Sequence, residues 1–385
     1  MPPAAPVRLR FQLLAFSLVR TVLNTGYRMV YPFLPVIARG LGVDLSAMAL
    51  AVTARSSLGL ASPFLGSTAD VRGRKAVMLT SLLLFAAAMA FVPLTPTYSA
   101  LFASLLIAGA AKIAFDPAMQ AYLGDRVQYA QRGLAIALTE FGWSGAFLLG
   151  VPLAGWAMAR AGWAGPFPWL AALALASALV LWRVLPRDPA QPSTPSWASG
   201  FLSVLSSRSA VAGLAVGVLI SAANEMVNIV FGAWLEASFG LQVVALGAAS
   251  AIIGASELTG EGLVALVADR LGKRRAVALG VMLNGLAGLA LALLGRSLAG
   301  ALLGLFALYL SFEFTLVSAI PLMTELVPAA RATLMAANVG AHSAGRALGA
   351  LLGPVLFGGG LFSVVAAAGA LDLAALAALL LFVRE

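Results

Sequence analysis

Ionisable side chains recur inside the long apolar stretches of this chain, and their types indicate two kinds of chemistry. A charge at the centre of a bilayer costs at least about 2.5–3.5 kcal/mol, so these groups must face the protein interior. Interior carboxylates can carry protons, and interior guanidinium or ammonium groups can bind anions. The residues are Arg20, Arg28, Arg55, Lys112, Asp116, Glu140, Glu225, Glu257, Glu261, Glu313, Arg346 and Asp372.

Several of the acids are candidates for a proton carrier. Glu257 and Glu261 are four residues apart, so on a helix they share a face and repel each other, which suits a group that binds a proton. Alternatively, Glu261 lies near the membrane surface and stays ionised. Glu313 is the first candidate for the proton site, and Glu225 is a further one.

A predicted substrate cavity draws on the remaining interior polar groups. Asn224, Glu225 and Asn228 form a polar patch within an apolar run. Lys112 and Asp116 are one helical turn apart and can pair, either as a structural bridge or as part of a substrate site. The predicted cavity residues are Arg28, Arg55, Lys112, Asp116, Asn224, Glu225, Asn228 and Arg346.

The interior charges are distributed unevenly, mostly basic in the first half of the chain and mostly acidic in the second. Two interpretations remain open. One is a substrate with an anionic or dipolar head, and the other is mutual pairing of the charges across the two halves. Aromatic walls for such a cavity are offered by Tyr27, Tyr31, Trp143 and Trp234.

The composition is that of a membrane protein. The 385 residues are 61% hydrophobic and 10% charged, with a mean hydropathy of +0.98. Soluble domains carry about 25% charged residues, so this chain lacks the polar surface that water requires. The net charge of +9 fits basic loops at one membrane face. No separate basic domain indicates nucleic-acid binding.

The sequence excludes several classes of site. There is no cysteine and only one histidine, His342, which excludes disulfides, thiolate metal sites and multi-histidine metal centres. No Walker loop, G-x-S-x-G or H-E-x-x-H motif is present. We therefore expect no enzyme, no cofactor and no metal.

About twelve apolar runs are long enough to span a bilayer as helices, each needing about 20 residues. A stretch rich in proline, serine and threonine at 185–207 separates six from six. The predicted domains are therefore 1–184, the linker 185–207 and 208–385. The predicted spans are 11–38, 45–69, 76–95, 98–124, 134–160, 163–184, 209–237, 243–268, 276–295, 298–325, 332–358 and 361–383.

Basic residues between the spans predict the orientation. Most lie in one set of loops and ends, whereas the opposite set carries only Arg39, Arg160 and Arg296. Because basic loops stay in the cytoplasm, both termini and the linker are predicted to be cytoplasmic. The expected location is the cytoplasmic (inner) membrane.

A charged island occurs once in each half, at nearly the same offset. Ala69 to Lys75 returns, altered, as Ala268 to Arg274. Asn24 with Asn224, and Gly150 with Gly349, repeat at nearly the same spacing. The chain therefore looks like two copies of one unit. The glycine of each island permits a turn with positive φ.

The islands resemble the loop motif G-x-L-A-D-R-x-G-R-K of the major facilitator superfamily. The first copy departs from the motif at Thr68 and Val71, and the second has Ala265 in place of the first glycine. The resemblance implies a cytoplasmic gate that locks the halves together, whereas the alternative is a turn that only sets topology. The predicted gate residues are Gly66, Asp70, Gly73, Arg74, Lys75, Asp269, Arg270, Gly272 and Lys273.

The resemblance implies an all-α membrane protein of the major facilitator fold, with about twelve transmembrane helices in two pseudo-symmetric bundles. It implies a secondary transporter that works by alternating access. The segment from Gly145 to Gly155 is similar to the glycine- and proline-rich motif of antiporting exporters, although Leu105 stands where drug exporters usually carry arginine. Proton-coupled export of small amphipathic molecules is the leading prediction.

Other functions remain open at the level of sequence. The alternative within the same fold is uptake or flipping of an anionic metabolite or lipid, indicated by Arg28, Arg55 and Lys112. A membrane-embedded sensor or enzyme is a remote alternative. The expected partners are a small-molecule substrate, protons and membrane lipids, and the expected state is a monomer.

Overall fold

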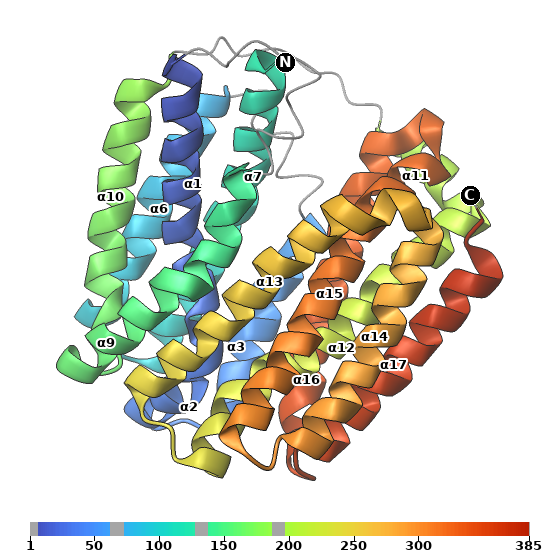
Figure 1. Ribbon diagram of the computed structural model, residues 1–385. Coiled ribbons are helices and arrows are strands. Elements are labelled where there is room, and N and C mark those ends of the chain that lie inside the picture. Colours follow the sequence, from blue (N-terminus) through green and yellow to red (C-terminus); the bar gives the residue numbers. More distant parts are fainter. Residues whose placement is uncertain (1–6, 62–72, 128–137, 187–196, 385) are drawn as a thin grey trace.

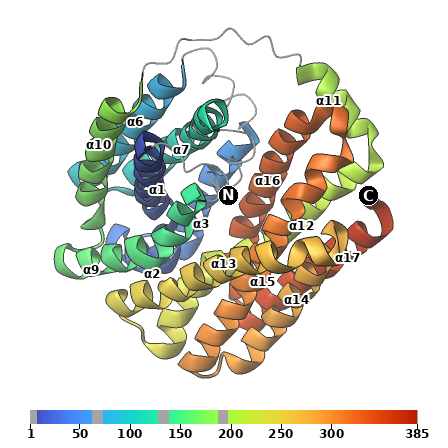
Figure 2. The ribbon, with the colours of Figure 1, turned by 45° about the horizontal axis from the view of Figure 1, so that its top comes forward.

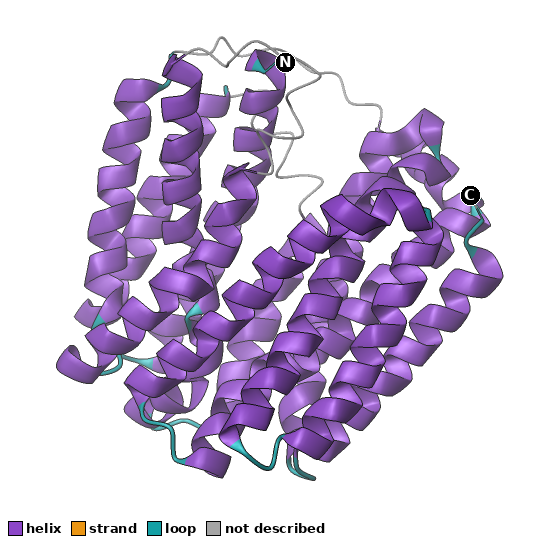
Figure 3. Ribbon diagram, viewed as in Figure 1, coloured by secondary structure: helices purple, strands orange, loops and turns teal. Residues whose placement is uncertain are grey.

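The structure, a computed structural model, describes residues 7–61, 73–127, 138–186 and 197–384. These residues form helices joined by short loops, and they contain no β-strand (Figure 3). Within the described ranges, nine helices are long and apolar enough to cross a membrane. α1 (Val7–Arg28) and α16 (Arg331–Phe357) have the length but are less apolar, because they carry polar and charged residues.

The first half of the chain contains the helices that are blue to green in Figure 1. The predicted first span is interrupted at Met29, where α1 ends and a second, proline-containing helix begins. After α1 the elements are α2 (Val30–Leu41), α3 (Leu45–Ser57), η1 (Leu58–Ala61), α6 (Arg74–Leu94), α7 (Tyr98–Arg126), the helix Leu138–Ala161 and α10 (Pro166–Val184).

The helix Leu138–Ala161 is not regular along its length. It contains a π-helical turn, η2 (Ala146–Gly150), and then α9 (Val151–Ala161). The Val151 amide donates to the Ala146 carbonyl, one residue further back than in an α-helix. Pro152 follows directly and has no amide hydrogen to donate, so a break in the α-helical pattern at this point is expected.

The second half contains the yellow to red helices of Figure 1. A short helix, α11, lies inside the stretch predicted as the linker. The elements are α11 (Trp197–Ser206), α12 (Arg208–Phe239), α13 (Val243–Leu271), α14 (Lys273–Leu294), α15 (Leu298–Leu326), η3 (Pro328–Ala330), α16 and α17 (Leu361–Phe382).

Capping residues explain why the helices begin where they do. The side chain of Asp44 accepts a hydrogen bond from the Ala47 amide at the start of α3. Thr97, Ser207 and Ser297 make the same contact at the starts of α7, α12 and α15. Each cap satisfies one of the backbone N–H groups that the first turn of a helix leaves unpaired. Short polar loops therefore suffice to separate long apolar helices.

The two halves repeat the same close helix contact. A Cβ atom on Gly150 would lie 1.8 Å from the Thr25 hydroxyl of α1, and a Cβ on Gly349 would lie 2.5 Å from the Ala222 carbonyl of α12. These glycines pair at the offset that the sequence predicts. Small residues let helix backbones approach closely within a membrane, so the same packing device serves both halves.

The halves meet along α2, α3, α9, α12, α13 and α16. In Figures 1 and 2, α1, α6, α7 and α10 stand together on one side, and α12, α14, α16 and α17 on the other. Gly232 of α12 touches Pro32 of α2, where a Cβ would lie 2.4 Å from the proline carbonyl. Arg39 of α2 pairs with Glu236 of α12 at the same end, with Nη2 and Oε1 2.6 Å apart.

Candidate functional site

A buried ion pair joins the two halves, between the end of α1 and the middle of α13. Arg28, the last residue of α1, pairs with Glu257 of α13 through both guanidinium nitrogens, and Nη1 donates to Glu257 Oε2 over 2.8 Å. Both side chains are 5% exposed. The Arg28 Nη1 group also donates to the Trp143 carbonyl over 3.0 Å. Bidentate arginine–carboxylate pairs are strong and directional, so this contact holds α1, α13 and the helix Leu138–Ala161 together.

Aromatic rings surround the same arginine. The Arg28 guanidinium lies 4.0 Å from the ring centre of Trp143 and 3.8 Å from that of Phe147. Lys112 of α7 and Arg346 of α16 also lie over the Trp143 ring, at 5.5 Å and 5.9 Å. Trp143 thus stands among cations from three other helices, where its ring can stabilise positive charge away from water.

A second arginine, Arg55 of α3, is fully buried beside two tyrosines. Its Nη1 group donates to the Tyr27 carbonyl over 2.7 Å, and its Nη2 group donates to the Tyr31 hydroxyl over 3.1 Å. The guanidinium lies 3.7 Å from the centre of the Tyr27 ring. Arg55 forms no ion pair with a described residue, so its charge is held by a carbonyl, a hydroxyl and an aromatic face.

The polar patch of α12 forms a hydrogen-bonded chain. The Asn228 amide donates to Glu225 over 3.2 Å, and the Tyr309 hydroxyl of α15 donates to Asn228 Oδ1 over 2.7 Å. Glu225 interacts electrostatically with Arg346 and with Arg55. The second carboxylate oxygen, Glu225 Oε1, has no hydrogen-bond partner among the described residues. The Tyr31 hydroxyl also interacts with this carboxylate, so the patch connects α12 to α2.

The predicted proton carriers lie near one another on α13 and α15. Glu261 accepts a hydrogen bond from Ser144 over 3.4 Å, across the two halves. Glu313 interacts electrostatically with Glu257, Glu261 and Arg28. Gly260 lets the two helices approach here, because a Cβ on it would lie 3.1 Å from the Glu313 Cβ. The three carboxylates therefore form one interacting set, and only Glu257 has a cation as direct partner.

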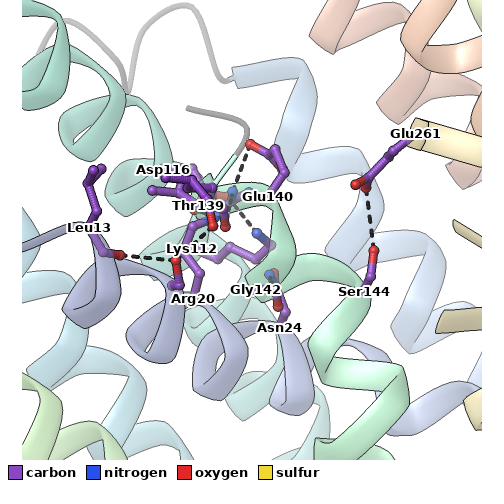
Figure 4. A network of polar contacts seen from close by, with 12 residues as sticks. Leu13, Arg20, Asn24, Lys112, Asp116, Thr139, Glu140, Gly142, Ser144 and Glu261 are labelled. Atoms are coloured by element: carbon purple, nitrogen blue, oxygen red, sulfur yellow. Dashed lines mark hydrogen bonds and ion pairs between the residues drawn. The ribbon is translucent and has the colours of Figure 1, made fainter. Parts of the chain in front are cut away.

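Lys112 and Asp116 form the predicted intrahelical pair, at 2.5 Å between Nζ and Oδ2. The structure extends it into a network of four charges (Figure 4). Arg20 lies 3.4 Å from Asp116 and 2.7 Å from Glu140. The sequence did not place Arg20 or Glu140 at the site, since their partners lie on other helices at unrelated sequence distances. The two cations and two acids of this network balance, so we assign the network to stabilising the helix packing within the first half.

Two further interior groups, His342 and Asp372, form no ion pair with a described residue. His342 Nδ1 is 2.7 Å from the Ser221 hydroxyl, which agrees with a packed and hydrogen-bonded histidine, and Arg346 acts on it electrostatically. Asp372 of α17 is buried, and a Cβ built on Gly285 of α14 would lie 3.8 Å from its Cβ. Trp234, expected as a wall, packs instead against Phe239 at 5.9 Å between ring centres. These side chains belong to the second half alone.

Three predicted gate residues, Arg74, Lys75 and Lys273, contact residues of their own half. Lys75 donates to the Trp182 carbonyl over 2.6 Å, at the end of α10. Its counterpart Arg274 donates to the Leu380 carbonyl over 2.5 Å, near the end of α17. Each island therefore attaches the third helix of its half to the last one, and the cations satisfy terminal carbonyls.

The ion pairs of the islands repeat in the same way. Arg74 pairs with Asp125 of α7, and Lys273 pairs with Glu325 of α15. Gly73 and Gly272 have the positive φ that the sequence predicts, 85° and 82°. The repeat in sequence is thus a repeat of contacts, and it includes two acids that the sequence analysis did not select.

The structure describes the other predicted gate residues only in part. Gly66 and Asp70 lie outside the described residues, as does the side chain of Asp269. Arg270 is exposed at the end of α13. Whether the islands lock the halves together therefore stays a prediction.

Family comparison agrees with the architecture. The family model described as Major Facilitator Superfamily matches residues 16–222. The uncharacterized MFS-type transporter YceJ of Bacillus subtilis (strain 168) is 26% identical over 273 residues, 70% of each chain. The uncharacterized MFS-type transporter YwfA of the same organism is 31% identical over 144 residues, 37% of this chain and 35% of that protein. The chain thus matches about a third of YwfA's length.

Solved structures share the fold at low identity. A bacterial homologue of the human lysosomal transporter Spinster, in an inward-facing and occupied conformation, has a TM-score of 0.78 at 16% identity, covering 98% of this chain and 97% of that one. The human organic anion transporter MFSD10 has a TM-score of 0.74 at 20% identity, covering 97% and 100%. At these identities the likeness concerns the fold alone.

Proposed function

The chain belongs to the Major Facilitator Superfamily and is a membrane transporter, not an enzyme, and we propose that it exports small amphipathic molecules by alternating access, coupled to protons. In this proposal, residues 1–184 and 208–385 rock against each other about a central site, and 185–207 connects them. The chain acts as a monomer in the inner membrane with both termini in the cytoplasm. The basic loops support this orientation.

The observation that carries the proton-coupling proposal is the Arg28–Glu257 pair beside Glu313. The pair connects the two halves, while Glu313 interacts electrostatically with both of its members and has no hydrogen bond or ion pair with a described residue. A proton that binds in this set changes the charge balance across the contact between the halves. Protonation can therefore favour one arrangement of the halves over another.

Flux measurements in proteoliposomes test the proposal. The purified full-length chain is reconstituted, and a chemically varied panel of amphipathic compounds is offered with and without a pH gradient. We expect a gradient directed against substrate movement to accelerate flux at least several-fold over the gradient-free rate. Flux that is the same with and without the gradient would refute proton coupling. Flux through protein-free vesicles is the control for leakage.

A second candidate function is transport of an anion, which Arg55 and Arg346 favour because neither forms an ion pair with a described residue. Electrostatics then predicts the direction of coupling. A bound anion attracts a proton to nearby Glu225 and Glu313, so the anion and the proton would move together. The same vesicles distinguish the candidates, because exchange and co-transport respond to opposite gradients.

A further inference from the structure

Tyr27, Trp143 and Arg346 are partly exposed side chains that converge from three helices. The ring centres of Tyr27 and Trp143 are 6.4 Å apart, and the Arg346 guanidinium lies 5.9 Å from the Trp143 ring. Their neighbours Arg28 and Arg55 are buried. Trp143 is flanked by cations from both halves, so these three side chains lie where the halves face each other.

The cations around these side chains are held in different ways. Arg28 and Lys112 form ion pairs with Glu257 and Asp116. Arg55 and Arg346 both interact electrostatically with Glu225, but no ion pair forms with it. Glu313 also acts on Arg346 from α15. Arg346 is therefore a cation inside the membrane that no carboxylate of a described residue contacts directly, which is costly.

We propose that Tyr27, Trp143 and Arg346 form a subsite for an aromatic organic anion with a single acidic group. Arg346 binds the acidic group, because it is the accessible cation and none of its guanidinium nitrogens has a hydrogen-bond or ion-pair partner among the described residues. The two rings receive the flat apolar body of the ligand by offset or edge contacts. Arg55 is a positioning residue that holds Tyr27 and Tyr31 from beneath.

The same geometry disfavours other ligand charges. A cationic ligand would lie beside Arg346 and within reach of the fields of Arg28 and Lys112, all of which flank Trp143. A neutral ligand would leave the Arg346 guanidinium without a charged partner in direct contact. An anion supplies that partner through a charge-assisted hydrogen bond, which is stronger than a bond between neutral groups. This inference rests on the transport role proposed above, in its anion form.

Matched probes of one ring system test the subsite. Isothermal titration calorimetry on the full-length chain in detergent compares 2-naphthoate, 2-naphthamide, 2-naphthylmethylamine and cyclohexanecarboxylate. We expect 2-naphthoate to bind at least about tenfold more tightly than the amide, the ratio that corresponds to 1.4 kcal/mol. The affinity for 2-naphthoate should also exceed the affinities for 2-naphthylmethylamine and cyclohexanecarboxylate. Equal binding of the amide or the amine, or no binding of any probe, would overturn the proposal.

Variants locate the effect at Arg346. Arg346→Gln should reduce the preference for naphthoate over naphthamide to about one, while Arg346→Lys keeps part of it. Arg160→Gln is the matched control, since Arg160 stacks on Trp156 at 3.9 Å on the exposed surface. An unchanged preference in Arg346→Gln refutes the subsite. If naphthoate preference is absent but pH-driven flux of other compounds persists, this inference fails and the transport proposal stands.

Discussion

Glu313 has no hydrogen bond or ion pair with any residue in the described part of the chain, although it is only 5% exposed. Asp372 shares this property, but of the two only Glu313 interacts with the buried ion pair that joins the two halves. Glu257 is held by Arg28, and Asp116 by Lys112 and Arg20. An acid that is already paired with a cation gains little free energy from protonation. An unmatched acid in a low-dielectric site gains most from protonation, so Glu313 is the best candidate for the coupling group.

We expect Glu313→Gln to uncouple transport from the pH gradient. The amide mimics the protonated acid, so substrate exchange across the vesicle membrane should continue at a rate within about threefold of the parent while the response to the gradient is lost. Flux with and without the gradient is the measurement. Asp372→Asn is the control, because it removes a buried acid outside the set of Glu257, Glu261 and Glu313. A preserved gradient response in Glu313→Gln would exclude Glu313 as the coupling group.

Packing of α16 on α12 shows how an element positions the site. Gly345, Gly349 and Gly353 face α12 at successive turns, and a Cβ at each would lie within 2.5 Å of an atom of that helix. A Cβ built on Gly349 would also lie 2.7 Å from the Glu225 Cβ. Without these glycines the helices could not bring Arg346 and Glu225 close together, so the packing and the polar cluster depend on each other.

Gly349→Ala should destabilise the protein by about 1–3 kcal/mol, because the added methyl overlaps a backbone carbonyl that cannot move easily. The melting temperature in detergent is the measurement. Gly340→Ala on the same helix is the control, since a Cβ there meets nothing within 4 Å and should leave stability unchanged or slightly higher. Equal melting temperatures for both variants would contradict the packing argument.

Among the described residues, the ion pair between the halves at the helix ends lies at one end of the molecule. Arg39 and Glu236 pair there, and Gly155 lies against the Val243 carbonyl, at 2.9 Å from a built Cβ. At the other end, the described pairs Arg74–Asp125 and Lys273–Glu325 stay within single halves. The structure thus has its halves joined at the Arg39 end, and alternating access requires that this end can separate.

Arg39→Glu should favour separation of that end, because it places two carboxylates together. An exposed pair contributes about 0.2–1 kcal/mol, so a population shift of up to about fivefold is expected. Spin labels on cysteines at Ala161 and Gln242 report the distance, without background, since the chain has no cysteine. Arg39→Glu combined with Glu236→Arg should restore the parent distribution; no shift in the single variant would show that the pair does not hold this end.

Sequence by itself determined that the chain is helical, spans a membrane and is built from two related halves. Those properties follow from local information, since a spanning helix needs about 20 apolar residues in a row and a repeat is visible at its offset. The i, i+4 pair of Lys112 and Asp116 could be predicted for the same reason. So could the positive φ of Gly73 and Gly272.

Only the tertiary structure decided which interior charges meet. Arg28 and Glu257 are 229 positions apart, and Arg20 reaches Glu140 from a different helix. Electrostatic energy depends on distance in space and on burial, and neither can be read from sequence spacing when the partners lie on separate helices. For the same reason the packing of the helices left Arg346 accessible beside Tyr27 and Trp143 and covered Arg55.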